Sequence, residues 1–86
     1  MMQSRRLDPL LRRAQEREDA VARELAERQR AHALQESRLE ELRRYLEEYA
    51  STQMTAVSPA QLANRRAFLD RLESAVEHQS RNVDLS

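Results

Sequence analysis

The chain has 86 residues, with no glycine, no cysteine, three aromatic residues and a charged fraction of 35%. A chain this short rarely encloses a core deep enough to keep water out of an active site, and without cysteine it has no disulfides or thiolate metal ligands. Basic and acidic residues number 15 each, so nucleic acid is not an expected partner. The composition favours long helices and a role that is not catalytic.

The N-terminus does not read as a targeting or anchoring segment. Arg5, Arg6, Asp8 and Pro9 stand where a signal peptide would need an unbroken apolar run. No apolar stretch in the sequence approaches the length that spans a membrane. We therefore expect a cytoplasmic location.

The first predicted element is a long helix over about residues 7–51. Seam positions recur along it at alternating spacings of four and three, which is the heptad period of a coiled coil. The a positions are Leu11, Leu25, Leu39 and Leu46, and the d positions are Leu7, Val21, Leu42 and Tyr49. Glu18, Arg28, His32 and Gln35 make the middle of this seam polar, which lowers its stability.

A connection is predicted over about residues 52–58, where the heptad lapses into polar and β-branched residues. Ser58, Pro59 and Gln61 then form the pattern of a capping box with proline in the first turn, so a second helix is predicted over about residues 59–84. Its a positions are Leu62, Leu69, Val76 and Val83. A short connection makes the two helices antiparallel. The expected fold is a single all-α domain over residues 1–86, a two-helix antiparallel coiled-coil hairpin with its tip near Met54.

The two predicted helices differ in length, so folding back about Met54 leaves the stretch before about Val21 without a partner. Two explanations remain open. The second helix is truncated relative to a longer native chain, which we favour, or the unpaired stretch pairs with another copy of the chain. In either case we expect this chain to self-associate through an apolar stripe of Leu7, Leu10, Leu11, Ala14 and Val21.

A candidate binding surface lies on one edge of the predicted hairpin. In an antiparallel pair the g positions of both helices share an edge, and folding about Met54 brings Tyr45 close to Phe68. Such an aromatic strip could dock a partner. The alternative is that the two rings pack on each other as a wider core, and the sequence favours neither interpretation.

The sequence does not predict a catalytic site, a cofactor-binding site or a metal-binding site. His32 lies on the seam and His78 falls roughly opposite it, but two nitrogens are fewer than zinc requires. The absence of glycine excludes phosphate-binding loops, and there is no arrangement of residues that would activate a nucleophile. We predict no catalytic, cofactor-binding or metal-binding residues.

Two runs beside the tip, together with the Ser4-Arg-Arg-Leu-Asp-Pro-Leu10 start, resemble the FliJ family of flagellar export proteins. These runs are Leu39-Glu-Glu-Leu-Arg-Arg-Tyr45-Leu-Glu-Glu-Tyr49 and Leu62-Ala-Asn-Arg-Arg-Ala-Phe68-Leu-Asp-Arg-Leu72. The resemblance implies a soluble coiled-coil stalk of the type III export apparatus, cytoplasmic and peripherally associated with the inner-membrane export machinery. The implied partners are the export ATPase, the cytoplasmic domain of the export gate and export chaperones.

The resemblance also implies a gate-binding patch, which maps onto Leu42, Tyr45, Tyr49, Phe68, Leu72 and Ala75. Arg38 and Gln79, at the ends of this patch, depart from the polar residues that we would expect there. Family members also have a longer second helix, and the ends remote from the tip are expected to engage the ATPase. The alternative function is a structural coiled-coil scaffold that assembles only with itself.

Overall fold

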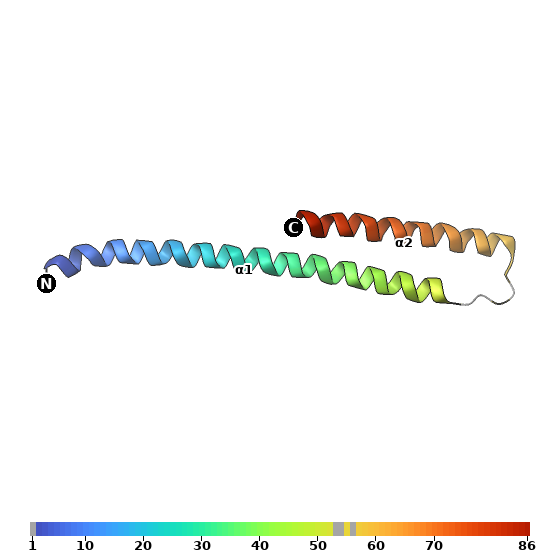
Figure 1. Ribbon diagram of the computed structural model, residues 1–86, viewed down its shortest axis with the longest axis horizontal. Helices are drawn as coiled ribbons and strands as arrows, with labels where there is room; N and C mark the ends of the chain where they lie inside the picture. The colour runs from blue at the N-terminus through green and yellow to red at the C-terminus, as the bar shows by residue number, and fades with distance from the viewer. Residues whose placement is uncertain (1, 53–54, 56) are drawn as a thin grey trace. The chain divides into compact units, whose positions relative to one another are not determined.

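The computed structural model describes the backbone of residues 2–52, 55 and 57–86, and the side chains of residues 8–52, 55 and 57–86. It contains two helices, α1 (Met2–Ser51) and α2 (Pro59–Leu85), and no strand among the described residues (Figure 1). The chain divides into two units, Met1–Ala31 and His32–Ser86. We call the second unit the hairpin, and residues 8–31 of the first the leading segment.

The hairpin is formed by α2, which folds back along the C-terminal part of α1 (Figure 1). Leu39 from α1 and Leu72 from α2 are its buried apolar side chains, with 7% and 8% of their surface exposed. Both lie at seam positions of the heptad, and most other seam residues of the hairpin are half-buried. The predicted all-α antiparallel hairpin is therefore confirmed.

The register of the hairpin differs from the predicted one. The Gln79 side chain bonds to Gln35, and the Arg65 guanidinium bonds to the carbonyl of Tyr49, so the pairing is centred on residue 57. The predicted centre, Met54, is three residues away and itself lies outside the described residues. Apolar spacing defines which face of a helix is the seam, but the polar pairs along that seam select the register.

The end of the hairpin shifts with this register. His32 Nδ1 lies 2.5 Å from the hydroxyl of Ser86, so the pairing reaches His32 and not about Val21. His78 is exposed and lies about 12 Å from Ser86 along the helix axis, at about 1.5 Å per residue. The prediction that His78 lies opposite His32 is therefore wrong.

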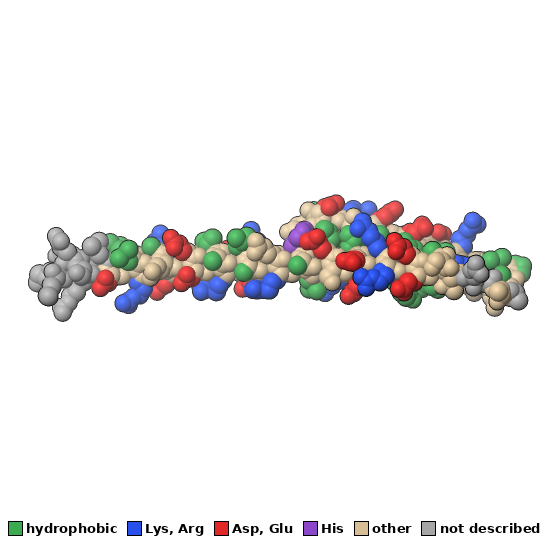
Figure 2. Space-filling model, turned by 60° about the horizontal axis from the view of Figure 1, so that its bottom comes forward, with side chains coloured by type: hydrophobic (Ala, Val, Ile, Leu, Met, Phe, Trp, Pro, Cys, Tyr) green, Lys and Arg blue, Asp and Glu red, His purple; other side chains and the backbone are tan. Residues whose placement is uncertain are grey.

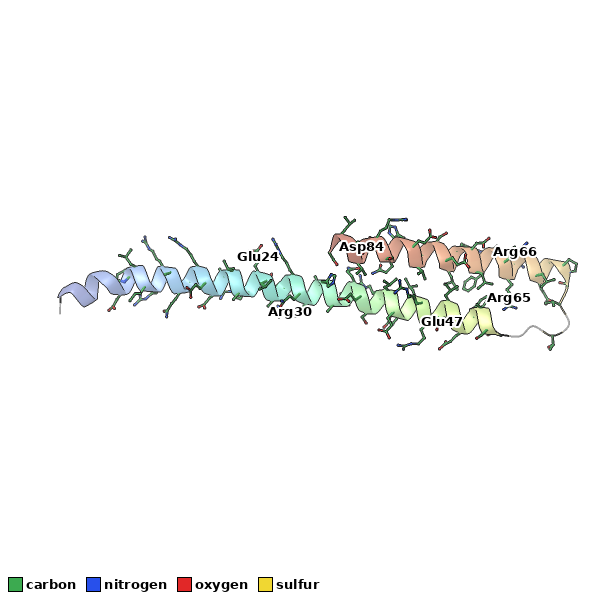
Figure 3. All side chains as sticks on the ribbon, in the orientation of Figure 1. Glu24, Arg30, Glu47, Arg65, Arg66 and Asp84 are labelled. Atoms are coloured by element: carbon green, nitrogen blue, oxygen red, sulfur yellow. The ribbon has the colours of Figure 1, made fainter. Side chains whose placement is uncertain are left out.

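Both helix ends at the connection are capped by side chains. The predicted capping box of α2 is confirmed: the Ser58 hydroxyl accepts from the Gln61 amide at 3.2 Å, and the Gln61 side chain accepts from the Ser58 amide at 3.0 Å. At the end of α1, Arg65 donates to the carbonyls of Tyr49 and Ala50 at 3.3 and 3.0 Å, and its side chain lies between the helices (Figure 3). A cation on these carbonyls also opposes the negative end of the helix dipole. Arg65 thus takes the place of the glycine cap that the sequence lacks.

The leading segment is helical throughout and carries its apolar residues on the surface. Leu11, Val21 and Leu25 are 60%, 64% and 55% exposed, and Leu10 is exposed to a similar extent. Hydrophobic side chains gather in patches along this part of α1, between interleaved acids and arginines (Figure 2). The Leu7 side chain, which the sequence places in the same stripe, lies outside the described residues.

Candidate partner-binding site

Three aromatic rings meet on one edge of the hairpin close to the connection. Phe68 from α2 lies edge-on to Tyr45, with ring centroids 6.4 Å apart and planes at 81°. It is also tilted against Tyr49, with centroids 4.6 Å apart. We call Tyr45, Tyr49 and Phe68 the aromatic edge. Contacts of this geometry contribute about 0.5–1.5 kcal/mol each beyond the area they bury, so the rings hold one another in place.

The rings of the aromatic edge differ in their access to solvent. Tyr49 and Phe68 are half-buried, whereas Tyr45 keeps 49% of its surface exposed. Both sequence interpretations therefore describe part of the site: the rings do pack on one another, and the outermost ring remains open. A large ring held on a rigid helix and half exposed is suited to insertion into a pocket of another protein.

The other residues of the implied patch lie at different depths. Leu42 and Ala75 are half-buried, whereas Leu72 is buried at the centre of the hairpin seam. Leu72 therefore supports the surface from beneath and offers almost no area for contact. Whether the six residues together bind a partner stays a prediction.

Gln79 has a structural role that sequence reasoning did not assign. Its side chain is 8% exposed, and its amide nitrogen donates to the backbone carbonyl and the side-chain oxygen of Gln35 at 2.9 and 2.8 Å. Its own oxygen accepts from Asn82 at 3.2 Å. The signal in the sequence was that Gln35 and Gln79 both occupy d positions. A polar pair on the seam in this form fixes register, and the buried Gln79 side chain offers almost no area to a partner.

The chain was compared with known proteins as a whole. The family model described as "Flagellar FliJ protein" matches residues 2–86. The chain belongs to the FliJ family. The resemblance seen in the tip-proximal runs is thereby confirmed, and membership makes this a protein associated with flagellar export. No curated protein and no solved structure matches the chain.

The described part of this FliJ-family chain offers no cluster suited to metal chemistry. No group of three or more His, Cys, Asp or Glu side chains within it is placed to hold an ion. His32 instead contacts Glu36 one turn away, at 3.0 Å, besides Ser86. Within the same residues, neither helix has a stretch long and apolar enough to cross a membrane. The aromatic edge remains the feature of the hairpin best suited to function.

Proposed function

We propose that this chain is a cytoplasmic, non-enzymatic component of the flagellar type III export apparatus, and that its aromatic edge docks the cytoplasmic domain of the export gate. The proposal rests on the match of nearly the whole chain to the FliJ family and on one structural observation. The observation is that Tyr45 is half exposed although its neighbours Tyr49 and Phe68 are held in the hairpin.

The aromatic edge has the properties of a binding hot spot. Its helices fix the backbone, and the contact of Phe68 with both tyrosines restricts the rotation of all three rings before a partner arrives. Little conformational entropy is therefore lost on docking, and the Tyr45 ring can be buried at small cost. The tyrosine hydroxyl adds a polar group that can bond at the rim of an apolar pocket.

The wider role that we propose is a stalk between two parts of the export machinery. The aromatic edge would face the gate, and the part of α1 remote from the connection would couple to the export ATPase, while export chaperones would be carried between them. In this role the chain associates peripherally with the inner-membrane apparatus. Two helices with balanced surface charge are suited to a stalk, because they hold a binding edge at a fixed distance without a large core.

The test is the affinity of purified chain for the cytoplasmic domain of the gate, measured by calorimetry for Tyr45→Ala and for a matched control. Leu62→Ala is the control, because Leu62 is an apolar side chain of α2 with 52% exposure, close to the 49% of Tyr45, and lies outside the aromatic edge. Tyr45→Ala should weaken binding about 30-fold, the equivalent of about 2 kcal/mol for a hot-spot ring, with unchanged helicity by circular dichroism. Leu62→Ala should bind as the native chain does.

Phe68→Ala separates support from contact. Because Phe68 packs on both tyrosines, its loss should weaken gate binding and also lower the unfolding temperature. Equal gate affinity in the native chain and in Tyr45→Ala would contradict the proposed docking. A native chain that fails to bind the gate and assembles only with itself would favour the scaffold.

A further inference from the structure

Arg65 is a charged side chain on the hairpin seam. It occupies a d position of α2, where a coiled coil favours an apolar residue, and it is half-buried. Removing a guanidinium from water costs free energy unless hydrogen bonds replace those to water. Arg65 makes two such bonds, because its Nη2 atom donates to the carbonyls of Tyr49 and Ala50 at 3.3 and 3.0 Å. This seam position therefore holds a bond between the two helices, where an apolar side chain would only fill space.

The two carbonyls belong to the last turn of α1, which ends at Ser51. The last turn of a helix opens most easily, because its carbonyls lack partners farther along the helix. Tyr49 lies in this turn and makes the closest ring contact of the aromatic edge, with its centroid 4.6 Å from that of Phe68. Opening of the last turn would therefore remove the contact that holds Phe68 most directly.

Bonds within α1 also cap this turn, but they do not connect it to α2. The hydroxyls of Ser51 and Thr52 donate to the carbonyl of Glu48 at 3.0 and 2.8 Å. The Thr52 amide donates to the carbonyl of Tyr49 at 3.3 Å. Each of these bonds favours a helical backbone and leaves the distance between the helices free. The bonds of Arg65 are different, because they attach the same turn to the other helix.

Arg65 is also placed to act on the ring contacts. It lies three residues before Phe68 on α2, and residues three apart on a helix are neighbours on its surface. The second helix therefore holds the backbone of Tyr49 through Arg65 and the ring of Tyr49 through Phe68. Two attachments fix both the position and the orientation of a side chain, where a single attachment would leave it free to rotate.

We propose that Arg65 is a positioning residue for the aromatic edge. By holding the last turn of α1 against α2, it keeps Tyr49 packed on Phe68. Through Phe68, which also contacts Tyr45, it keeps the exposed ring in the orientation that docks a partner. The inference rests on the proposed docking of the gate and adds to it a residue that acts through the rings.

The first experiment measures the contact between Tyr49 and Phe68 in the whole chain without a partner, by the nuclear Overhauser effect between the two rings. Arg65→Met keeps an unbranched stem and removes the donors, so the effect should be lost. Methionine suits a d position, so helicity by circular dichroism should be unchanged. Arg65→Lys should retain the effect, because an ammonium group also donates to the last carbonyls of a helix.

Two control variants separate this role from charge and from capping. Arg66→Met removes the same charge from the neighbouring residue, whose side chain is exposed and makes no hydrogen bond to the described part of α1. Thr52→Val removes a bond that caps the end of α1 from within. Both variants should keep the native effect between Tyr49 and Phe68. A loss in either variant equal to that in Arg65→Met would show that charge or capping alone is responsible, and would overturn the proposal.

The second experiment measures affinity for the cytoplasmic domain of the gate by calorimetry. Arg65→Met should bind about fivefold more weakly, the loss expected for one hydrogen bond, whereas Arg65→Lys and Arg66→Met should bind as the native chain does. An unchanged affinity of Arg65→Met beside a weakened Tyr45→Ala would overturn the role of Arg65 and leave the docking intact.

The ring contact in the free chain tests Arg65 separately from the docking. A native chain that does not bind the gate would contradict the docking alone. Loss of the ring contact in Arg65→Met, with its retention in Arg65→Lys, would still support the positioning role. An unchanged ring contact in Arg65→Met would overturn that role whatever the gate affinity.

Discussion

The leading segment and the hairpin carry the same heptad period but differ in what covers their seams. In the hairpin Leu39 and Leu72 are almost fully buried, whereas Leu11 and Val21 of the leading segment keep about 60% of their surface exposed. The difference teaches that a heptad specifies a face of a helix and does not specify its partner. Where α2 supplies the partner the seam becomes a core, and elsewhere it remains a surface available for assembly.

The largest loss in the free energy of unfolding should come from shortening a leucine of the hairpin core. Leu72→Ala should lower the free energy of unfolding by about 2–3 kcal/mol, at the low end of the range for a buried leucine because a two-helix core relaxes easily. Leu11→Ala, on the exposed seam, should change it by less than about 0.5 kcal/mol in dilute protein. Urea denaturation followed by circular dichroism measures both. Equal losses would mean that the two seams are buried alike.

A smaller effect is expected at the polar pair that sets the register. Gln79→Leu leaves the Gln35 side chain without its partner, which should cost about 1–2 kcal/mol. Gln35→Leu combined with Gln79→Leu should recover most of that loss, because both polar groups are then replaced. A double-mutant cycle on the unfolding free energy measures the coupling. Additive losses in the double variant would show that the two side chains do not act as a pair.

The smallest loss of stability should come from removing an exposed ion pair, and this loss should be equal in the leading segment and in the hairpin. Arg28→Gln removes an exposed pair with Glu24 in the leading segment, and Arg44→Gln removes an exposed pair with Glu40 in the hairpin. Each pair spans one helical turn, so each loss should be about 0.3–0.5 kcal/mol at low salt and should vanish at high salt. Thermal melts at two ionic strengths measure it. A large effect confined to one region would point to a role beyond this local pairing.

The sequence predicted those features that depend on neighbours along the chain. The capping box at Ser58 and the seam positions of Leu39 and Leu72 follow from local spacing, and the structure contains them. The aromatic edge also followed from counting g positions, because Tyr45 and Phe68 share an edge in any nearby antiparallel register. These predictions tolerate an error of a few residues in the register, because the assumed centre at Met54 and the observed centre at residue 57 both bring Tyr45 near Phe68.

The sequence did not predict features that depend on pairing between the helices. Centring the hairpin on Met54 placed His78 opposite His32, whereas the Gln35–Gln79 bond centres it on residue 57 and brings Ser86 there. Registers a few residues apart place similar apolar residues on the seam, so the choice depended on buried hydrogen bonds that spacing does not reveal. The half exposure of Tyr45 could not be predicted for the same reason.

The contrast between the two regions is tested most directly by amide hydrogen exchange along α1 in dilute, monomeric protein. We predict slow exchange for residues 34–49, which pack against α2, and rapid exchange for residues 10–30, whose seam has no partner under these conditions. Uniform protection along α1 in the dilute monomer would contradict the account.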